Sequence, residues 1–400
     1  MIQLHKLLSF CVLVISLLGW YTSAQSALPP LKVVQLGDSY SAGNGARSAS
    51  GKRNYQGVSG CYRSPTNWGN QFLDSLRDVF SVTYVNRACS GGEIKHILLP
   101  KEFKPSWAIN KVCPSPEYPD EESYTYDSVT NECTRQLKPQ IEGIDESVDL
   151  VLMTGGGNDL RFKDIIKQCF VAGPRDPAGC KEAVEFAEGN LVKVEDRLTD
   201  TFAELRSKLR PDARVVFVTY PYLVPDVGYY VEKWGDFYNA GDAIRNLGFA
   251  GDARQRAAVA VANTAAGEEF VILFDGTKEL FEGHLPSPSR GKNSDRWLYE
   301  AFETTRVLEW YHYKPLGHQN LASALSIFET FGAAGGVFDS KADIDVAFVI
   351  DTTGSMEDNI AQVRADLEGL VAQLIATTNS FGSSSNDQSK VFKLGPPPTM

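Results

Sequence analysis

The first three quarters of the chain alternate between short apolar runs and longer segments with helical periodicity. The apolar runs, rich in β-branched residues, are 32–36, 82–85, 149–153, 214–220 and 271–274. Runs that are apolar on both faces are typical of strands inside a parallel sheet. Helical periodicity at 67–79, 181–209 and 242–265 marks segments long enough to cross from one parallel strand to the next. The alternation predicts an α/β sandwich.

A closing helix and two long connections complete this part of the chain. Leu321, Leu325 and Phe328 are spaced as one apolar stripe on a helix. Residues 41–64 and 91–134 show neither pattern, and we expect them to be long loops. Cysteines fall in both segments, so disulfides would stiffen connections whose ordering is otherwise entropically costly.

The composition changes after residue 334 and predicts a second, small unit. We expect a linker at 335–342, followed by a unit at 343–378 in which a strand-like run at 344–350 precedes a helical stripe. Residues 379–400 are rich in Ser, Asn, Gly and Pro and predict a disordered tail. One strand and one helix cannot bury a core by themselves.

The N-terminus has the pattern of an export signal. Lys6 precedes an apolar run, and the small residues at 22–24 form a cleavage site before Gln25. We expect residues 1–24 to be a signal peptide, with an uncleaved membrane anchor as the alternative. The run of about 14 residues is short for a bilayer span, and we find no other candidate. The mature protein is expected to be secreted and extracellular, without stable membrane insertion.

Composition narrows the class of protein further. Of the 400 residues, 43% are apolar and 22% are charged, which allows a large buried core. The net charge is −11, and such an acidic excess argues against a protein built to neutralise phosphate backbones. We therefore expect no nucleic-acid partner.

Six of the seven cysteines are expected in the mature chain, because Cys11 lies in the signal. They are Cys61, Cys89, Cys113, Cys133, Cys169 and Cys180. An even number in an exported protein indicates disulfides rather than metal ligands, and no CxxC or CxxH spacing indicates zinc. Many pairings are possible, but we expect each cysteine to pair with its neighbour in sequence, because such pairs close short loops.

Residues suited to acyl transfer follow the first predicted strand. This strand ends in Gly37-Asp38-Ser39, at the carboxyl edge where open α/β sheets bind ligands. Ser39 is a candidate nucleophile, although the same residues could form only a turn that caps the next helix. The alternative nucleophile motif, GxSxG, does not fit Ser39, because Ser41 occupies its last position.

Three further clusters could complete such a site. A serine attacks a carbonyl only when a base takes its proton, and the resulting oxyanion needs N–H donors. Gly91, in Cys-Ser-Gly-Gly, could present a backbone N–H, and Asn158, in Gly-Gly-Asn-Asp, a side-chain amide. His312 could be the base, with Glu309 as the carboxylate that orients its ring.

These four blocks, in this order, resemble the SGNH (GDSL) hydrolase family. The resemblance implies a three-layer α/β/α, flavodoxin-like sandwich with a mostly parallel five-stranded sheet, in a hydrolase domain at 25–334. The chain is most similar to the secreted, disulfide-bonded lipases and esterases of actinomycete type. The resemblance makes Ser39 the nucleophile, His312 the general base, and the Ser39 N–H, Gly91 N–H and Asn158 side chain the oxyanion hole.

The sequence departs from the family pattern before the histidine. The family usually has Asp three residues before it, where this chain has Glu309. A glutamate can still fix the imidazole tautomer, and some relatives use a main-chain carbonyl in place of the acid. A fold retained without activity is a further alternative.

The other histidines compete with His312 for the role of base. His318 ends the HxxxxGH spacing that the family also shows, and we expect it to be structural, with the role of base as the alternative. His284 is also expected to be structural, and His96 to be exposed or to line the substrate site.

Aromatic and apolar residues could shape an acyl pocket or serve as ordinary packing. They are Trp107, Tyr118, Tyr124, Tyr126, Tyr220, Tyr222 and Leu223. No Gly-rich phosphate loop, dinucleotide fingerprint or HExxH motif occurs in the sequence, so we expect hydrolysis without a cofactor.

The unit at 343–378 carries a motif of its own. Asp351, Thr353 and Ser355 share one loop after an apolar run, and such hard oxygen ligands suit Mg²⁺ or Ca²⁺. The segment resembles the first strand and helix of a von Willebrand factor A domain, whose later segments are missing. The metal site is therefore expected to be incomplete, and the three residues could equally cap a helix. We expect a truncated gene model or splice form.

The sequence as a whole predicts a secreted serine esterase or lipase. Its substrate would be a small-molecule ester, or an acyl ester of a lipid or glycan. The alternative is an extracellular binding or adhesion protein, in which a complete A domain contacts a protein partner and the SGNH-like part is a scaffold. Acyl transfer to an alcohol instead of water would use the same residues.

Overall fold

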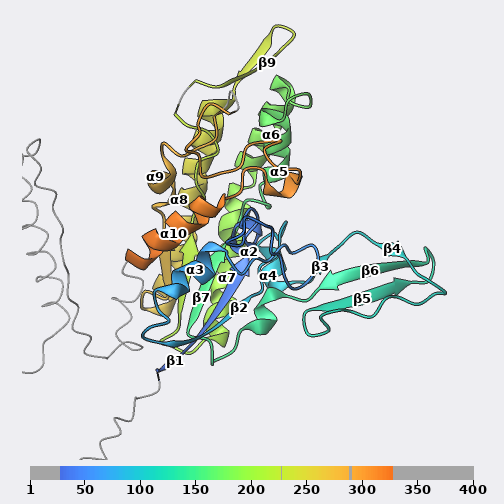
Figure 1. Ribbon diagram of the computed structural model, residues 1–400, viewed down its shortest axis with the longest axis vertical. Coiled ribbons are helices and arrows are strands. Elements are labelled where there is room, and N and C mark those ends of the chain that lie inside the picture. The colour runs from blue at the N-terminus through green and yellow to red at the C-terminus, as the bar shows by residue number, and fades with distance from the viewer. Residues whose placement is uncertain (1–27, 227, 288–290, 328–400) are drawn as a thin grey trace, which may run out of the picture. The chain divides into compact units, whose positions relative to one another are not determined.

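A five-stranded parallel sheet forms the centre of the computed structural model, which describes residues 28–226, 228–287 and 291–327 (Figure 1). The strands are β1 (Pro30–Gly37), β2 (Ser81–Asn86), β7 (Leu150–Thr154), β8 (Arg214–Val218) and β11 (Val271–Phe274). Their order is β11-β8-β7-β1-β2, and each neighbouring pair is parallel. The predicted α/β fold is confirmed, and all five apolar runs overlap these strands.

Helices cover both faces of this sheet and give it three layers, because strand side chains point alternately to the two faces. In β1, Val33 packs into the core on one face and Val34 into the core on the other. The first face is covered by α3 (Trp68–Asp74), α9 (Thr277–Phe281) and α10 (Pro315–Ile327). The second is covered by α4 (Lys95–Leu98), η1 (Gln140–Gly143), α7 (Leu191–Lys208) and α8 (Ala240–Ala266).

Three elements differ from the prediction. Strand β2 lies at the sheet edge, so its side chains alternate between half-buried and exposed positions instead of being buried on both faces. Helix α3 already ends at Asp74. The helix predicted at 181–209 is two helices, α6 (Pro177–Gly189) and α7, which meet at Asn190 with φ −107° and ψ 4°. Gly189 and Asn190 both have low helix propensity. In addition, the side-chain amide of Asn190 donates to the Phe186 carbonyl at 2.8 Å.

The connection predicted as a loop at 91–134 is instead folded. It contains α4 and most of a second, antiparallel sheet, which Figure 1 shows apart from the central one. The strands of this sheet are β3 (Lys101–Glu102), β4 (Ser106–Trp107), β5 (Glu122–Asp127) and β6 (Glu132–Leu137). Asp127 accepts from the Val129 amide at 2.8 Å and starts the turn between β5 and β6.

Shorter elements complete the described part of the chain. They are α2 (Ser39–Ala42), α5 (Phe162–Ile165), the π-helix η2 (Ile166–Phe170), the hairpin of β9 (Tyr230–Lys233) and β10 (Asp236–Asn239), and η3 (Val307–Glu309). No helix in the described ranges is long and apolar enough to cross a bilayer.

The three disulfides join sequence neighbours, as predicted. They are Cys61–Cys89, Cys113–Cys133 and Cys169–Cys180. Several predictions lie outside the described residues: the signal peptide, the linker and A-domain-like unit at 335–378, the tail, and Phe328.

Replacing Phe217 by alanine should destabilise the fold strongly. Its side chain is fully buried in β8 and makes an edge-to-face contact with Phe202, at 5.6 Å between ring centroids. We expect a loss of about 3–5 kcal/mol in the free energy of unfolding, measured with denaturant. Val85→Ala on edge strand β2, where the side chain is 37% exposed, should cost about 0.5 kcal/mol or less. Equal losses would contradict this description of the core.

Candidate active site

Ser39 lies at a sharp turn from β1 into α2. Gly37 has φ +114°, and a side chain there would collide with the Thr154 carbonyl, so this position requires glycine. Asp38 caps α2 by accepting a hydrogen bond from the Tyr40 amide at 2.9 Å. The turn therefore has the capping role that was the alternative interpretation, and it also places the Ser39 side chain beyond the end of the sheet.

The structure brings His312 to Ser39 from 273 positions away in sequence. The Nε2 atom of His312 lies 2.7 Å from Ser39 Oγ, and both side chains are buried. The imidazole packs against the rings of Tyr40 and Phe162, at 4.8 and 5.8 Å between centroids. Burial lowers the pKa of His312 to about 4, against the opposing effects of the Trp310 hydrogen bond and the Glu309 charge. At neutral pH the ring is uncharged.

A main-chain carbonyl orients the imidazole. Nδ1 of His312 lies 2.9 Å from the Trp310 carbonyl oxygen. A carbonyl can only accept, so Nδ1 carries the hydrogen, and Nε2 of the neutral ring has a free lone pair. The Ser39 hydroxyl therefore donates to Nε2, which is the arrangement that a general base requires.

The prediction that Glu309 orients His312 is wrong. The Glu309 carboxylate is fully buried, but it accepts hydrogen bonds from Arg47 Nη2 at 2.8 Å, Arg53 Nε at 2.6 Å and Tyr55 Oη at 2.9 Å. Burial alone would raise the pKa of Glu309, but the hydrogen bonds from Arg53, Arg47 and Tyr55 outweigh it and lower that pKa to about 2. The negative charge of Glu309 is thus already matched by the guanidinium groups of Arg47 and Arg53.

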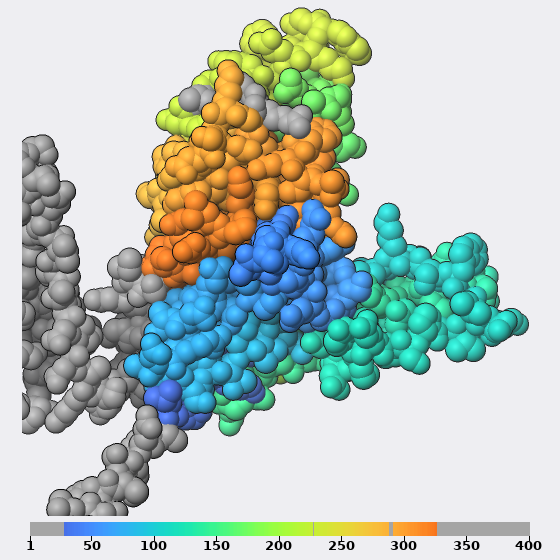
Figure 2. All heavy atoms as spheres, in the orientation of Figure 1, coloured from blue at the N-terminus to red at the C-terminus, as the bar shows by residue number. Residues whose placement is uncertain are grey.

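Glu309 instead joins two distant segments of the chain. Arg47, Arg53 and Tyr55 belong to the connection after α2, whereas Glu309 ends the 3₁₀ turn before His312. Figure 2 shows segments from near the start and the end of the described chain side by side, in blue and orange. The ion cluster thus holds the histidine turn against the serine side of the molecule.

The expected oxyanion donors surround the same sheet edge. Asn158 follows β7, and its side-chain amide donates to the Gly92 carbonyl at 2.9 Å, which ties the Asn158 loop to the Gly91 loop. Gly91 has φ +71°, a conformation that favours glycine. Within the described part of the chain, neither the Ser39 nor the Gly91 amide is paired with an acceptor. In the described structure, both N–H groups therefore remain free to donate.

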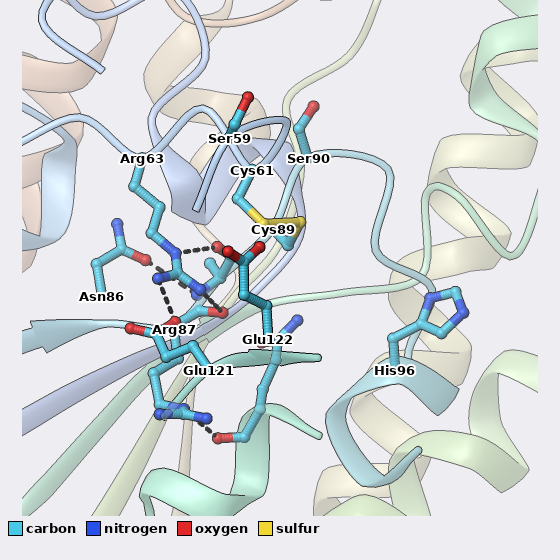
Figure 3. Close-up of a disulfide and its surroundings, with 12 residues drawn as sticks. Ser59, Cys61, Arg63, Asn86, Arg87, Cys89, Ser90, His96, Glu121 and Glu122 are labelled. Atoms are coloured by element: carbon cyan, nitrogen blue, oxygen red, sulfur yellow. Dashed lines mark hydrogen bonds and ion pairs between the residues drawn. A yellow bond between two sulfur atoms is a disulfide. The ribbon is translucent and has the colours of Figure 1, made fainter. Parts of the chain in front are cut away.

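A disulfide and an arginine fix the Gly91 loop (Figure 3). Cys61 and Cys89 are fully buried and bonded, and the Ser90 amide donates to the Cys61 carbonyl at 3.0 Å. Arg63 donates to the Ala88 carbonyl at 2.8 Å. Arg63 also pairs with Glu121, next to β5, so the second sheet supports this loop from outside.

Asp38 and Tyr220 link the serine turn to the Asn158 loop, a contact that the sequence did not reveal. Asp38 is buried and accepts from Thr154 Oγ1 at 2.8 Å and from the Tyr220 hydroxyl. The same hydroxyl accepts from the Gly157 amide at 3.2 Å. Burial raises the pKa of Asp38, against the hydrogen bonds that it accepts. In the sequence, the signal for this contact is limited to the aspartate directly before Ser39.

A cavity of about 110 Å³ lies beside Ser39. Its lining is mostly apolar and includes Phe162 and several residues of α8. Of the aromatic and apolar pocket candidates, Tyr220, Tyr222 and Leu223 line it. The other four belong to the second sheet or its loops and do not line this cavity: Trp107, Tyr118, Tyr124 and Tyr126. The sequence does not place these four, because the short strands of the second sheet lack a strand pattern.

The sequence profile of the GDSL-like lipase/acylhydrolase family matches residues 36–319, which is more than half of the chain. The chain belongs to this family. It is an ester-hydrolysing enzyme, and GDSL-like hydrolases need no cofactor. A comparison with curated proteins found no match.

Solved structures similar to this GDSL-like hydrolase include bacterial esterases. A phospholipase A1 from Streptomyces albidoflavus NA297 has 22% identity and a TM-score of 0.50, over 74% of this chain and 98% of that one. An extracellular lipase from Streptomyces rimosus has 20% identity and a TM-score of 0.47, over 74% and 99%. A family two carbohydrate esterase from Clostridium thermocellum has 16% identity and a TM-score of 0.33, over 76% and 65%. The first likeness shows a shared fold.

The other described histidines of the GDSL-like hydrolase hold local structure. His318 is buried, with Nε2 at 3.3 Å from the Asn44 carbonyl, and burial lowers its pKa to about 3. The His284 ring stacks on the Trp297 ring, at 3.7 Å between ring centroids. His96 is half-buried, and its Nδ1 accepts from the Glu93 amide at 2.9 Å, so it is neither exposed nor part of the cavity lining.

The structure does not address the predicted metal ligands. Among the described residues, no group of three His, Cys, Asp or Glu side chains could hold a metal ion. Asp351, Thr353 and Ser355 lie outside the described residues.

Glu309→Gln should lower stability in a pH-dependent way. The ordinary pKa of this carboxyl is 4.5 and its folded pKa is about 2, so the stabilisation is complete above about pH 4.5 and is lost as the pH falls through about 2. Denaturant unfolding at pH 7 should show a loss on the order of 3 kcal/mol, and the difference from wild type should shrink below about pH 4.5.

Glu282→Gln is the matched control, because Glu282 forms a half-exposed ion pair with Arg245. Such a pair contributes about 1 kcal/mol or less. A loss in Glu309→Gln that stays constant down to about pH 2 would contradict the assigned role of the carboxylate.

Proposed function

We propose that this protein is a secreted serine esterase or lipase in which Ser39, His312 and the Trp310 carbonyl form the catalytic unit. The observation that carries the proposal is the 2.7 Å contact between Ser39 Oγ and His312 Nε2, with Nδ1 bound to a main-chain acceptor. The adjacent cavity and the free Ser39 and Gly91 amides support an acyl-transfer reaction at this point.

The reaction begins when Ser39 Oγ attacks the carbonyl carbon of the ester. His312 Nε2 takes the hydroxyl proton, and the carbonyl oxygen becomes an oxyanion. The Ser39 N–H, the Gly91 N–H and the second N–H of the Asn158 amide stabilise this charge. Asn158 uses its other N–H for the Gly92 carbonyl, so the side chain is oriented before substrate binds.

Collapse of the tetrahedral intermediate breaks the bond to the alcohol oxygen. The protonated His312 gives its proton to that oxygen, and the alcohol leaves an acyl group on Ser39 Oγ. Water then attacks the acyl carbonyl while His312 takes a proton from it. The second intermediate releases the carboxylic acid, and the proton returns to Ser39. Atoms and charges balance without any further reactant.

The Trp310 carbonyl replaces the acid of a triad in this scheme. It fixes the tautomer before reaction, and its hydrogen bond strengthens when the ring becomes charged. A carbonyl contributes a dipole rather than a full charge, so the imidazole stays a weak base. This accounts for the His312 pKa of about 4, because the hydrogen bond to Trp310 offsets only part of the effect of burial.

The cavity beside Ser39 supports a class of substrate. An apolar lining favours the acyl chain of a small-molecule, lipid or glycan ester over a charged group. The three disulfides support an extracellular location, in line with a signal peptide at 1–24 and a hydrolase domain at 25–334.

Ser39→Ala should abolish hydrolysis of p-nitrophenyl acetate, because no other group at the site can form the acyl intermediate. His312→Ala should lose about 10⁴-fold or more in kcat. Both variants should keep the wild-type circular dichroism spectrum. A fluorophosphonate probe should label wild type at Ser39 and leave Ser39→Ala unlabelled. Unchanged turnover in a folded Ser39→Ala variant would refute the proposal.

The activity should resist acid more than that of an enzyme with an ordinary histidine base. Only neutral His312 accepts the serine proton, and its pKa is about 4. The kcat/KM for a soluble ester should stay level down to about pH 5 and fall with a midpoint near pH 4. Circular dichroism on the same samples verifies folding. A midpoint near 6.5 would mean that the base titrates as an unburied imidazole.

A further inference from the structure

One face of α8 forms a wall of the cavity beside Ser39. The α8 residues that line the cavity are Ile244, Leu247, Gly248, Gly251, Asp252 and Gln255. They are spaced three and four apart, so they lie on one side of the helix. This strip of α8 presents about three helical turns to the cavity.

The two ends of the strip differ in their surroundings. At one end, the Gln255 amide donates to the Gly155 carbonyl at 3.2 Å, in the loop that carries Asn158. At the other end, Ile244 and Leu247 belong to an apolar cluster away from the sheet. The strip therefore leads from the proposed oxyanion site into an apolar region.

The strip contains two glycines in the interior of a long helix, where each costs about 0.5–1 kcal/mol relative to alanine. Packing explains Gly248, because an added Cβ would lie 3.3 Å from the Tyr222 ring. Packing does not explain Gly251, since a Cβ there would have no atom within 4 Å, and its φ is not left-handed. The main effect of glycine at 251 is to leave the space beside it open.

The charged residues near the strip do not compete for this space. Lys278 Nζ donates to Asp252 Oδ2 at 2.6 Å and to the Tyr220 carbonyl at 3.0 Å, and both side chains are buried. The ion pair is satisfied by groups of the protein. An apolar chain can lie alongside Gly251 without leaving a charge unpaired.

We propose that Gly251 determines which acyl chain lengths the enzyme accepts. The inference rests on the proposed function and specifies its substrate: esters whose linear apolar acyl chain extends from Ser39 along α8. Gly251 lies one helical turn, about 6 Å, beyond Gln255. A short acyl group stays close to Ser39, whereas a long one such as octanoyl extends along the strip and occupies the space that a side chain at 251 would fill.

The test compares Gly251→Ala and Gly251→Leu with wild type on p-nitrophenyl acetate, butyrate and octanoate. The quantity measured is the ratio of kcat/KM for octanoate to kcat/KM for acetate. Gly251→Leu should lower this ratio by about tenfold or more, because the branched side chain excludes several methylene groups. Gly251→Ala should lower it less, and alanine also favours the helix, so this variant keeps the test valid if leucine impairs folding.

Ala253→Leu is the matched control, because Ala253 lies on the exposed side of the same helix. Its octanoate-to-acetate ratio should equal that of wild type.

Three outcomes would overturn the proposal. One is an unchanged ratio in both Gly251 variants. Another is an equal change in Ala253→Leu. The third requires acetate esters of two different alcohols as additional substrates: if the Gly251 variants change only the selectivity between these alcohols, the alcohol and not the acyl chain occupies the cavity. Failure of the proposed function is distinct, because wild type itself would then hydrolyse none of the esters and resist the fluorophosphonate probe.

Discussion

The hydrogen bond from His312 Nδ1 to the Trp310 carbonyl is the interaction on which the candidate active site depends. It determines which nitrogen faces Ser39, and donor and acceptor are only two residues apart, so the backbone of one turn sets it. Hydrogen bonds to its main-chain atoms hold that turn. The Tyr40 hydroxyl donates to the Tyr311 carbonyl at 2.6 Å, and the Tyr311 amide donates to the Tyr299 carbonyl at 2.7 Å. Tyr40, the residue after the proposed nucleophile, therefore positions the proposed base.

Two buried carboxylates flank the Ser39–His312 pair, and neither contacts the imidazole. Asp38 holds the serine turn to the Asn158 loop through Tyr220, and Glu309 holds the histidine turn through two arginines. Burying a carboxylate is costly unless charged or hydrogen-bonding groups match it. Glu309 is matched by the guanidinium groups, so little of its negative charge remains to raise the pKa of His312. A neutral carbonyl can then orient a buried ring without adding another charge to the interior.

Parts of this architecture follow from the sequence because they depend on local pattern. The apolar runs identify the five strands, and short motifs after two of them contain Ser39 and Asn158. A further motif, before the closing helix, contains His312. The second sheet does not follow from the sequence, because its strands are short and mostly half-exposed and so lack a continuous apolar run. The partners of Glu309 could not be found either. They lie more than 250 positions away, and a pattern of charges does not specify which long-range pair forms.

The two halves of the active site are held by different forces. The serine half depends on the sheet: Gly37 pairs with Thr154 in the register of β1 and β7, above a fully buried apolar layer. The histidine half depends on polar contacts, chiefly the ionised Glu309 cluster. Hydrophobic packing does not titrate, whereas the Glu309 cluster needs its charge. Because the pKa of His312 is about 4 and that of Glu309 is about 2, acid protonates the proposed base while its turn is still held. In the proposed mechanism, loss of activity in acid therefore precedes loss of the site's geometry.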